Sequence, residues 1–459
     1  QAAEFYEGIA LLRQAPSFPH SPGRIRNLLA NLVPLLVEHT ALTEHPRHLF
    51  ARLDRFAESL GSRASLYSEL VENREFRDRF LKILGSGEFL SETLIYSPEL
   101  LDSVSDLPPP RISYNELERT VHQEVSAGRK PEYGLRLFKR REEFKVGLHD
   151  LFHDRPLQSR RWLSELADLC VRWTASTICR DSPELAQEDF SLLALGKLGG
   201  QELTYHSDLD LILVFDQQKT STAQESFSEL LRKVHDELEL YTELGRSYKL
   251  DLRLRPEGKY GALAIPCQRL EEYFRTRAEP WERLAYVKLR ALDGFSQGLD
   301  LDSLIWEKPF SAEEVKELNR IRMRKEDEIG AETNSSRYDF KVGRGGLMDI
   351  QFVVQYLQIQ QGVKGANTLQ ACHQLVAEGY LDEVAGDTLS QGQKFLFSLE
   401  TIQRLLQERP SNTLSKEPAS NHLLAHFLDV ESGEALLERY LSERERIRAI
   451  YRQFFPADS

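Results

Sequence analysis

The stretch GKLGGQELTYHSDLDLILVFD, residues 196–216, decides the fold at the centre of the chain. Its apolar end, LDLILVF, is a short continuous run that predicts a buried strand. Residues two apart in a strand share a face, so Asp208 and Asp210 point the same way while the leucines between and after them face a core. Before the strand, three glycines lie within five positions around Lys197. Glycine lets a chain turn tightly or approach a ligand closely.

Neighbouring segments predict the rest of a small mixed sheet. FSLLALG at 190–196 is a second short apolar run, SYKLDLRLRP at 247–256 alternates as a strand does, and GALAIP at 261–266 supplies a further strand. Between them, residues 226–244 have a helical pattern. Strands mixed with helices over about 120 residues indicate an α+β domain.

Helical patterns flank this domain on both sides, so we expect a predominantly helical α+β protein. We divide the chain into a helical N-terminal region (1–185), the sheet domain (186–310) and a C-terminal helical bundle (311–459). In the first region, apolar side chains of RHLFARLDRFAESL form one helical stripe. The members of this stripe are Leu49, Phe50, Leu53, Phe56 and Leu60.

Local signals mark where these helices begin and end. Prolines break the pattern at 17–24 and at 105–112, and a polar connector with a proline follows at 180–190. Ser311 followed three positions later by Glu314 is a capping-box pattern, which predicts a helix start.

Composition excludes several classes of protein. The formal charge is 59 − 72 = −13, which argues against a nucleic-acid binder. No apolar run is long enough to span a membrane, and we expect a cytoplasmic protein. The four cysteines lack zinc-ligand spacing and are expected to be buried apolar residues. Residue 1 is Gln, so we expect an excised or processed chain.

The acidic residues suggest a metal site. Two carboxylates side by side repel each other, and a divalent cation such as Mg²⁺ relieves that repulsion with the oxygen ligands it prefers. The strand at 247–256 adds Asp251, Arg253 and Arg255 on one face. If it lies beside the first, three carboxylates hold two metal ions for an in-line phosphoryl or nucleotidyl transfer, and the arginines meet phosphate oxygens.

Other polar residues have open interpretations. Lys197 either reaches a phosphate or is a solvated turn residue, and His206 is more often a structural hydrogen-bonding residue. Trp281 is expected in a core, while Lys288 and Arg290 either face a nucleotide or do not. Lys341 and Arg344 flank a glycine turn, and Asp349 after it either complements a helix dipole or orients an active-site base. A solvated helix face is expected for Arg320, Arg322, Arg324 and Lys325.

The glycine turn, the DxD pair (Asp208 and Asp210) and the later Asp251 together resemble the pattern of the DNA polymerase β-like nucleotidyltransferase superfamily. More closely, GKLGGQELTYHSDLDLILVFD, LDLRLRPEGKYGALAIP, WERLAYVKLRAL and GRGGLMDIQFVVQYLQ are similar to glutamine synthetase adenylyltransferases. These four stretches span 196 to about 358, and the N-terminal helical part is also similar. Two departures stand out, since Gln351 replaces the usual Glu and Ala194 stands where a Gly is frequent.

The resemblance implies roles for individual residues. Asp208, Asp210 and Asp251 would bind two Mg²⁺, and Asp251 would also help to deprotonate an incoming tyrosine hydroxyl. The residues implied to bind the triphosphate of ATP are Gly199, Gly200 and Ser207, with Arg253 and Arg255 stabilising phosphate charge.

The resemblance also implies partners and a direction. Glutamine synthetase and a PII-type signal protein are the implied partners. The long helical lead-in and GGLMDIQF favour the C-terminal adenylylating half, which transfers AMP from ATP to a tyrosine of glutamine synthetase. Two alternatives stay open: phosphorolytic removal of AMP, and a module that binds nucleotide or signal protein without turnover.

Overall fold

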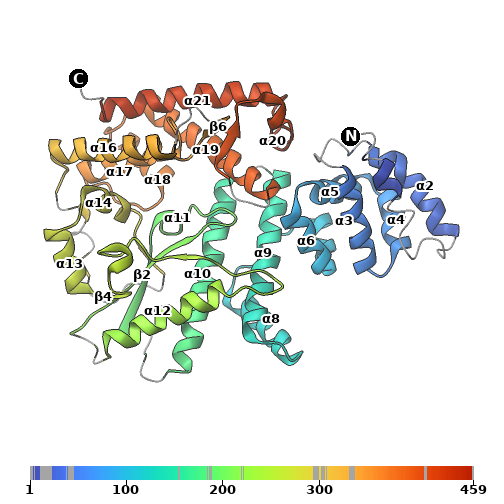
Figure 1. Ribbon diagram of the computed structural model, residues 1–459, viewed down its shortest axis with the longest axis horizontal. Coiled ribbons are helices and arrows are strands. Elements are labelled where there is room, and N and C mark those ends of the chain that lie inside the picture. The colour runs from blue at the N-terminus through green and yellow to red at the C-terminus, as the bar shows by residue number, and fades with distance from the viewer. Residues whose placement is uncertain are drawn as a thin grey trace.

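The computed structural model describes residues 4, 6–10, 23–37, 39, 46–153, 156–182, 185, 189–218, 220, 222–292, 299–300, 305–306, 308–329, 336–407 and 411–456. Most of the predicted break at 17–24 lies outside these residues, as do residues 183–184 and 186–188 on either side of the predicted domain boundary. Helices dominate, and one small mixed sheet lies among them (Figure 1), as the sequence predicts.

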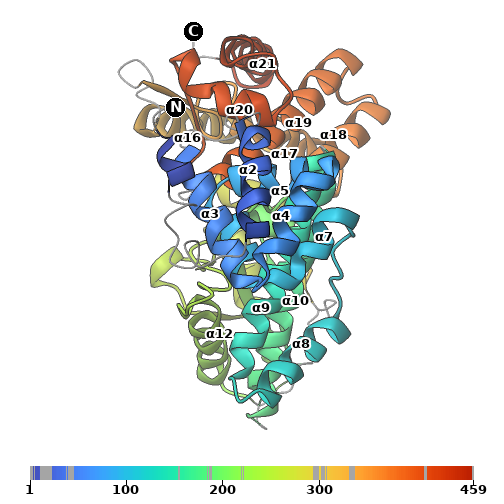
Figure 2. The same ribbon diagram turned by 90° about the vertical axis from the view of Figure 1, so that its right-hand side faces the viewer.

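Short helices form the N-terminal part, which projects from one side of the molecule (Figures 1 and 2). They are α2 (Gly23–Val37), α3 (Pro46–Ser59), α4 (Arg63–Glu72), α5 (Arg74–Gly85), α6 (Glu88–Tyr96), η2 (Pro98–Leu100) and α7 (Leu101–Asp106). The predicted stripe is confirmed on α3, where Leu49, Phe50, Leu53 and Phe56 are buried. The proline break is also confirmed, because α7 ends at Asp106 and the next helix starts at Tyr114.

Three helices connect this part to the sheet. They are α8 (Tyr114–Ser126) and the long pair α9 (Pro131–His153) and α10 (Pro156–Arg180). Helix α10 packs against α12 (Gln224–Glu239), which covers the sheet, and also against α19 (Glu383–Leu406) of the C-terminal bundle. The α10 helix therefore contacts both other parts of the molecule.

The sheet is mixed, with strand order β3-β2-β1-β5 and with β4 also paired to β2. Its strands are β1 (Phe190–Ala194), β2 (Leu209–Phe215), β3 (Leu250–Asp251), β4 (Ala264–Pro266) and β5 (Arg290–Ala291). Strand β2 is antiparallel to β1 and parallel to β3 and β4. Buried leucines along β2 confirm the predicted strand at 209–215.

The prediction of a strand over 247–256 is wrong for most of its length. Only Leu250 and Asp251 pair with β2, and the chain then turns through residues 253–257 into η4 (Gly258–Tyr260). Buried Arg255 stabilises this turn by donating hydrogen bonds to the carbonyls of Leu252, Lys259 and Gly261. An alternating pattern of polar and apolar residues is therefore compatible with a turn that buries Arg255, as well as with a strand.

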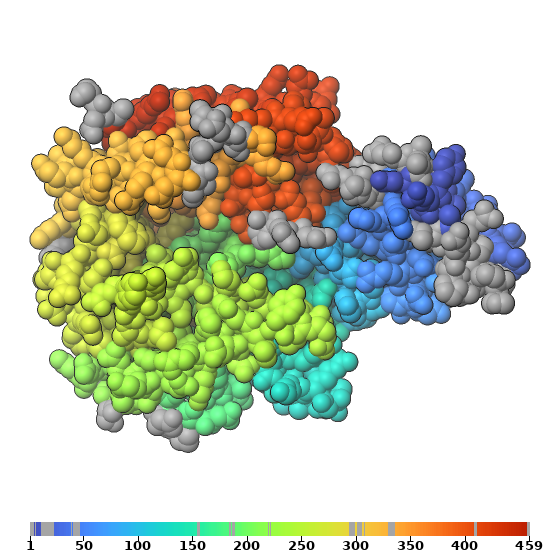
Figure 3. All heavy atoms as spheres, viewed as in Figure 1, coloured from blue at the N-terminus to red at the C-terminus, as the bar shows by residue number. Residues whose placement is uncertain are grey.

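Helices return after the sheet and lie over it in Figure 1. They are α13 (Cys267–Thr276), α14 (Pro280–Tyr286), α16 (Ala312–Ile329), α17 (Leu347–Gln361), α18 (Thr368–Ala377), α19, η5 (Pro418–Asn421), α20 (His422–Phe427) and α21 (Gly433–Phe454). Two strands distant in sequence, β6 (Arg337–Asp339) and β7 (Thr413–Ser415), pair antiparallel in a separate small sheet. In Figure 3 the surface of this bundle meets that of the sheet domain along a broad boundary. The capping box is confirmed, since Ser311 and Glu314 each bond to the other's backbone N–H.

Two predictions about side-chain burial are wrong and one is right. Trp281 lies at the start of α14 with 36% of its surface exposed, so it is not a core residue. Arg322 is fully buried, because it pairs with Asp349 on α17 rather than facing solvent on α16. All four cysteines are buried, as expected.

Candidate active site

The sheet brings two of the predicted acidic residues side by side. Asp210 on β2 and Asp251 on β3 are register partners in a parallel pair, so their side chains leave the same face of neighbouring strands about 4.8 Å apart. Asp208 lies two residues before Asp210, just ahead of β2. The short strand β3 thus has one clear effect, which is to set Asp251 beside Asp210.

The glycine turn packs directly onto this acidic pair. Gly196 has a φ of +54°, and a Cβ placed there would lie 2.1 Å from the Oδ2 atom of Asp210. At Gly199 a Cβ would lie 1.9 Å from the carbonyl oxygen of Lys288, and at Gly200 it would lie 3.0 Å from that of Ala366. The glycines are therefore required for close packing of α11 (Gly196–Gly199) against its neighbours.

The electrostatics of the three carboxylates differ. Burial, together with the charge of Asp251, raises the pKa of Asp210 to about 6, although the charge of Lys341 opposes the rise. The hydrogen bonds from the Arg253 guanidinium, 3.0 Å from each carboxylate oxygen, lower the pKa of Asp251. Asp208 pairs with Lys249, whose Nζ lies 2.7 Å from its Oδ2.

These contacts decide how the residues fit a metal ion. Asp208 and Asp251 each form an ion pair with a cationic side chain. In the described part of the chain, no three Asp, Glu, His or Cys side chains lie close enough together to hold a metal ion as they stand. The donor chemistry nevertheless suits Mg²⁺, because crowded carboxylate oxygens with a raised pKa are relieved by a divalent cation. Arg253 and Lys249 are both substantially exposed, so neither buries its carboxylate partner.

Among the residues predicted to meet the triphosphate, Arg253 remains at the site and Arg255 does not face it. The side chain of Arg253 is 76% exposed and holds Asp251, whereas Arg255 is taken up by backbone carbonyls. Ser207 accepts a hydrogen bond from the backbone N–H of Thr204, at 3.2 Å, and so shapes the loop before Asp208.

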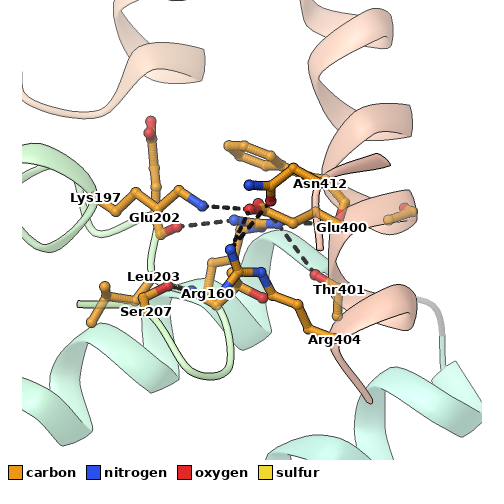
Figure 4. A network of polar contacts seen from close by, with 12 residues as sticks. Arg160, Lys197, Glu202, Leu203, Ser207, Glu400, Thr401, Arg404 and Asn412 are labelled. Atoms are coloured by element: carbon orange, nitrogen blue, oxygen red, sulfur yellow. Dashed lines mark hydrogen bonds and ion pairs between the residues drawn. The ribbon is translucent and has the colours of Figure 1, made fainter. Parts of the chain in front are cut away.

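Lys197 has a partner that the sequence reasoning missed. Its Nζ lies 2.6 Å from the Oε1 of Glu400, a fully buried residue of α19 (Figure 4). The two candidates on the far side of the turn are also engaged, since Lys288 pairs with buried Glu202 and Arg290 bonds to the carbonyls of Leu198 and Gly199. These three cations hold the turn in place.

The remaining candidates lie in the bundle or beside the loop. Asp349, at the first turn of α17, accepts hydrogen bonds from Arg322, Arg448 and the backbone N–H of Gly345. It thereby fixes the glycine turn that carries Lys341. His206 has a φ of +56° and packs edge-on against Phe89, with ring centroids 5.4 Å apart.

Comparisons with known proteins agree with the resemblance. A family model described as "Glutamate-ammonia ligase adenylyltransferase" matches residues 77–299, and one described as "GlnD PII-uridylyltransferase" matches residues 313–455. The first match contains every proposed ligand and the second contains Glu400.

Curated relatives carry the name bifunctional glutamine synthetase adenylyltransferase/adenylyl-removing enzyme. Those of Mesorhizobium japonicum, Bordetella bronchiseptica and Idiomarina loihiensis are 28%, 30% and 29% identical over 83%, 73% and 77% of this chain. The alignments cover 42%, 37% and 40% of the relatives, so the chain spans about two fifths of their length.

No helix among the described residues combines the length and apolar character that crossing a membrane requires.

The matched regions include the glycine turn, the acidic residues and the C-terminal bundle. The chain belongs to the glutamine synthetase adenylyltransferase family.

Proposed function

We propose that this chain transfers AMP from ATP to a tyrosine of glutamine synthetase in a Mg²⁺-dependent reaction. The observation that carries the proposal is the pairing of Asp210 with Asp251 on adjacent parallel strands, with the Gly196 turn packed against Asp210. This is the combination a polymerase β-like nucleotidyltransferase uses, and the match to adenylyltransferases over 77–299 supports it.

Asp208, Asp210 and Asp251 would hold two Mg²⁺, which neutralise phosphate charge and activate the attacking oxygen. The chain's own residues do the rest. Asp251 would help to accept the proton of the incoming tyrosine hydroxyl. Arg253, whose side chain is exposed and bonded to Asp251, would bind phosphate oxygens with its forked guanidinium. No protein nucleophile is needed, because positioning and charge stabilisation carry such transfers.

The second candidate is phosphorolytic removal of AMP from adenylylated glutamine synthetase. The relatives' printed name contains both activities, and this chain covers about two fifths of their length. The same acidic residues serve both directions. We favour adenylylation because GGLMDIQF at 345–352 and the long helical lead-in resemble the adenylylating half.

The proposed partners follow from the same similarity. Glutamine synthetase is the proposed acceptor, and the match of 313–455 to a PII-uridylyltransferase model supports a PII-type signal protein as a regulator. With these partners, we propose a cytoplasmic location.

Two assays on one preparation test the proposal, with Asp210→Asn as the matched control. In the first, the chain is mixed with unmodified glutamine synthetase, Mg²⁺ and ATP labelled at the α-phosphate. In the second, it is mixed with adenylylated synthetase, Mg²⁺ and phosphate, and ADP is measured. If the unmodified chain labels the synthetase and the Asp210→Asn variant does not, adenylylation is supported.

The other outcomes are equally informative. ADP release without labelling identifies the removal reaction and overturns the direction proposed here. Silence in both assays, with Mg²⁺-dependent binding of ATP, identifies a module that holds nucleotide without turnover.

A further inference from the structure

A buried ion cluster lies behind the candidate active site, centred on one carboxylate from the C-terminal bundle (Figure 4). Glu400 is fully buried on α19 and contacts three cations: Lys197 at 2.6 Å, Arg160 at 2.9 Å and Arg404 at 3.3 Å. Arg160 on α10 also stacks over the ring of Phe397, 3.7 Å from its centroid. Three parts of the chain, far apart in sequence, therefore meet at this carboxylate.

Each cation is connected to a different point of the loop between the glycine turn and the DxD pair. Lys197 belongs to the glycine turn itself. Arg160 donates a hydrogen bond to the carbonyl oxygen of Glu202 at 3.0 Å, and Arg404 donates one to that of Tyr205 at 2.8 Å. The segment from 197 to 205 is thus held at three points by side chains that share Glu400.

The charges in this cluster do not balance. One carboxylate faces three basic side chains, and burial with the nearby charges of Arg404 and Arg160 lowers the pKa of Lys197 to about 7, although Glu400 opposes the fall. Burial opposes the ionisation of Glu400, but the positive charges of Lys197, Arg160 and Arg404 outweigh it and lower the pKa of Glu400. Loss of that one negative charge would leave Arg160 and Arg404 buried together without the carboxylate that they share, which a buried cluster does not tolerate.

We propose that Glu400 is a positioning residue for nucleotide transfer: it holds the glycine turn and the loop before Asp208 in the conformation that receives the triphosphate. The proposal rests on the proposed function for its kinetic consequence. It makes α19 of the C-terminal bundle part of the active site through its contacts with Lys197 and with the carbonyl oxygen of Tyr205.

The test uses four variants of the full chain. Glu400→Gln keeps the shape and removes the charge, Lys197→Met removes the cation in the turn, and a third variant carries both. Leu436→Ala is the matched control, because Leu436 is a fully buried residue of α21, which packs on α19, and its loss destabilises the same bundle without removing an ion pair.

Two readouts separate positioning from stability. Steady-state kinetics give kcat and the KM for ATP, and hydrogen exchange gives the protection of backbone amides in 196–208. In Glu400→Gln we expect the KM for ATP to rise about tenfold, which is the scale of loss when a residue that orients a binding residue is removed. We also expect faster hydrogen exchange, confined to the backbone amides of 196–208. Leu436→Ala should leave the KM for ATP and the exchange of 196–208 unchanged below its melting temperature.

The double variant should be no worse than the poorer single variant, since Lys197→Met acts through a contact that Glu400→Gln already removes. An unchanged KM and unchanged exchange in Glu400→Gln, or single effects that add, would overturn the proposal. If the unmodified chain lacks turnover in both directions, the proposed function fails, and the exchange measurement still decides whether Glu400 positions the loop.

Discussion

Replacing Asp210 with asparagine should stabilise the fold at neutral pH while removing a proposed metal ligand. Burial, together with the charge of Asp251, raises the pKa of Asp210 from an ordinary value of 3.8 to about 6. A carboxyl with a higher pKa when folded binds more protons in the folded state, so stability falls as pH rises between the two values. The difference is about 2 pKa units, and at 1.36 kcal/mol each the ionised carboxylate destabilises the fold by about 3 kcal/mol.

The assay is the melting temperature of the unmodified chain and of Asp210→Asn from pH 4 to pH 8 without divalent cations. About 3 kcal/mol corresponds to roughly 6–12 °C for a unit of 150–250 residues. The variant should match the unmodified chain at pH 4 and melt higher by that amount at pH 8. Millimolar Mg²⁺ at pH 8 should then raise the melting temperature of the unmodified chain only, because a ligand stabilises the state that binds it.

Asp251→Asn is the control with the opposite sign. The hydrogen bonds from Arg253 lower the pKa of Asp251, so its charge stabilises the fold above the unfolded pKa. This variant should therefore melt lower than the unmodified chain as pH rises. Identical pH profiles for the unmodified chain and Asp210→Asn, or a variant that melts lower at pH 8, would refute the reasoning.

Three further predictions follow from the site and the bundle. Gly199→Ala should lower the melting temperature more than Gly200→Ala, since the added Cβ meets the Lys288 carbonyl at 1.9 Å; equal losses in thermal melts would contradict this. Asp349→Leu should destabilise by about 3 kcal/mol, measured by denaturant unfolding, because it leaves buried Arg322 short of a counter-charge; a neutral effect would show that Glu326 suffices. EDTA should abolish AMP transfer and added Mg²⁺ should restore it; transfer that persists in EDTA would rule out the proposed metal role.

The parts of the fold that local patterns specify were predictable. The apolar run of β2 and the stripe on α3 each follow from burial of one continuous set of side chains. The capping box at Ser311 follows from two residues three apart. In each case the residues that decide the structure are neighbours in the chain.

Contacts between distant residues were not predictable from one sequence. The alternation at 247–256 indicates a strand, but the carbonyls that surround Arg255 turn the chain after Asp251. Arg322 sits among polar residues on α16, and its partner Asp349 is 27 positions away. Both errors come from charged side chains that tertiary contacts bury and satisfy.

The same limit applied to the candidate site. The acidic residues could be selected because their strands place them on one face, and Asp210 with Asp251 are register partners. The sequence does not distinguish a Lys197 that reaches a phosphate from one in solvent, because nothing near it in sequence indicates a carboxylate partner. Glu400 lies in an amphipathic helix with no motif of its own.

The bond from Lys197 to Glu400 joins residues 203 positions apart and has a consequence for biosynthesis. At about 5–20 residues per second, the ribosome adds Glu400 roughly 10–40 s after Lys197. Throughout that interval the nascent chain holds its glycine turn and its aspartates but lacks the anion that unites three cations behind them. If Glu400 positions the loop as proposed, a chain released before α19 is made would carry the acidic motif without the carboxylate that holds the loop.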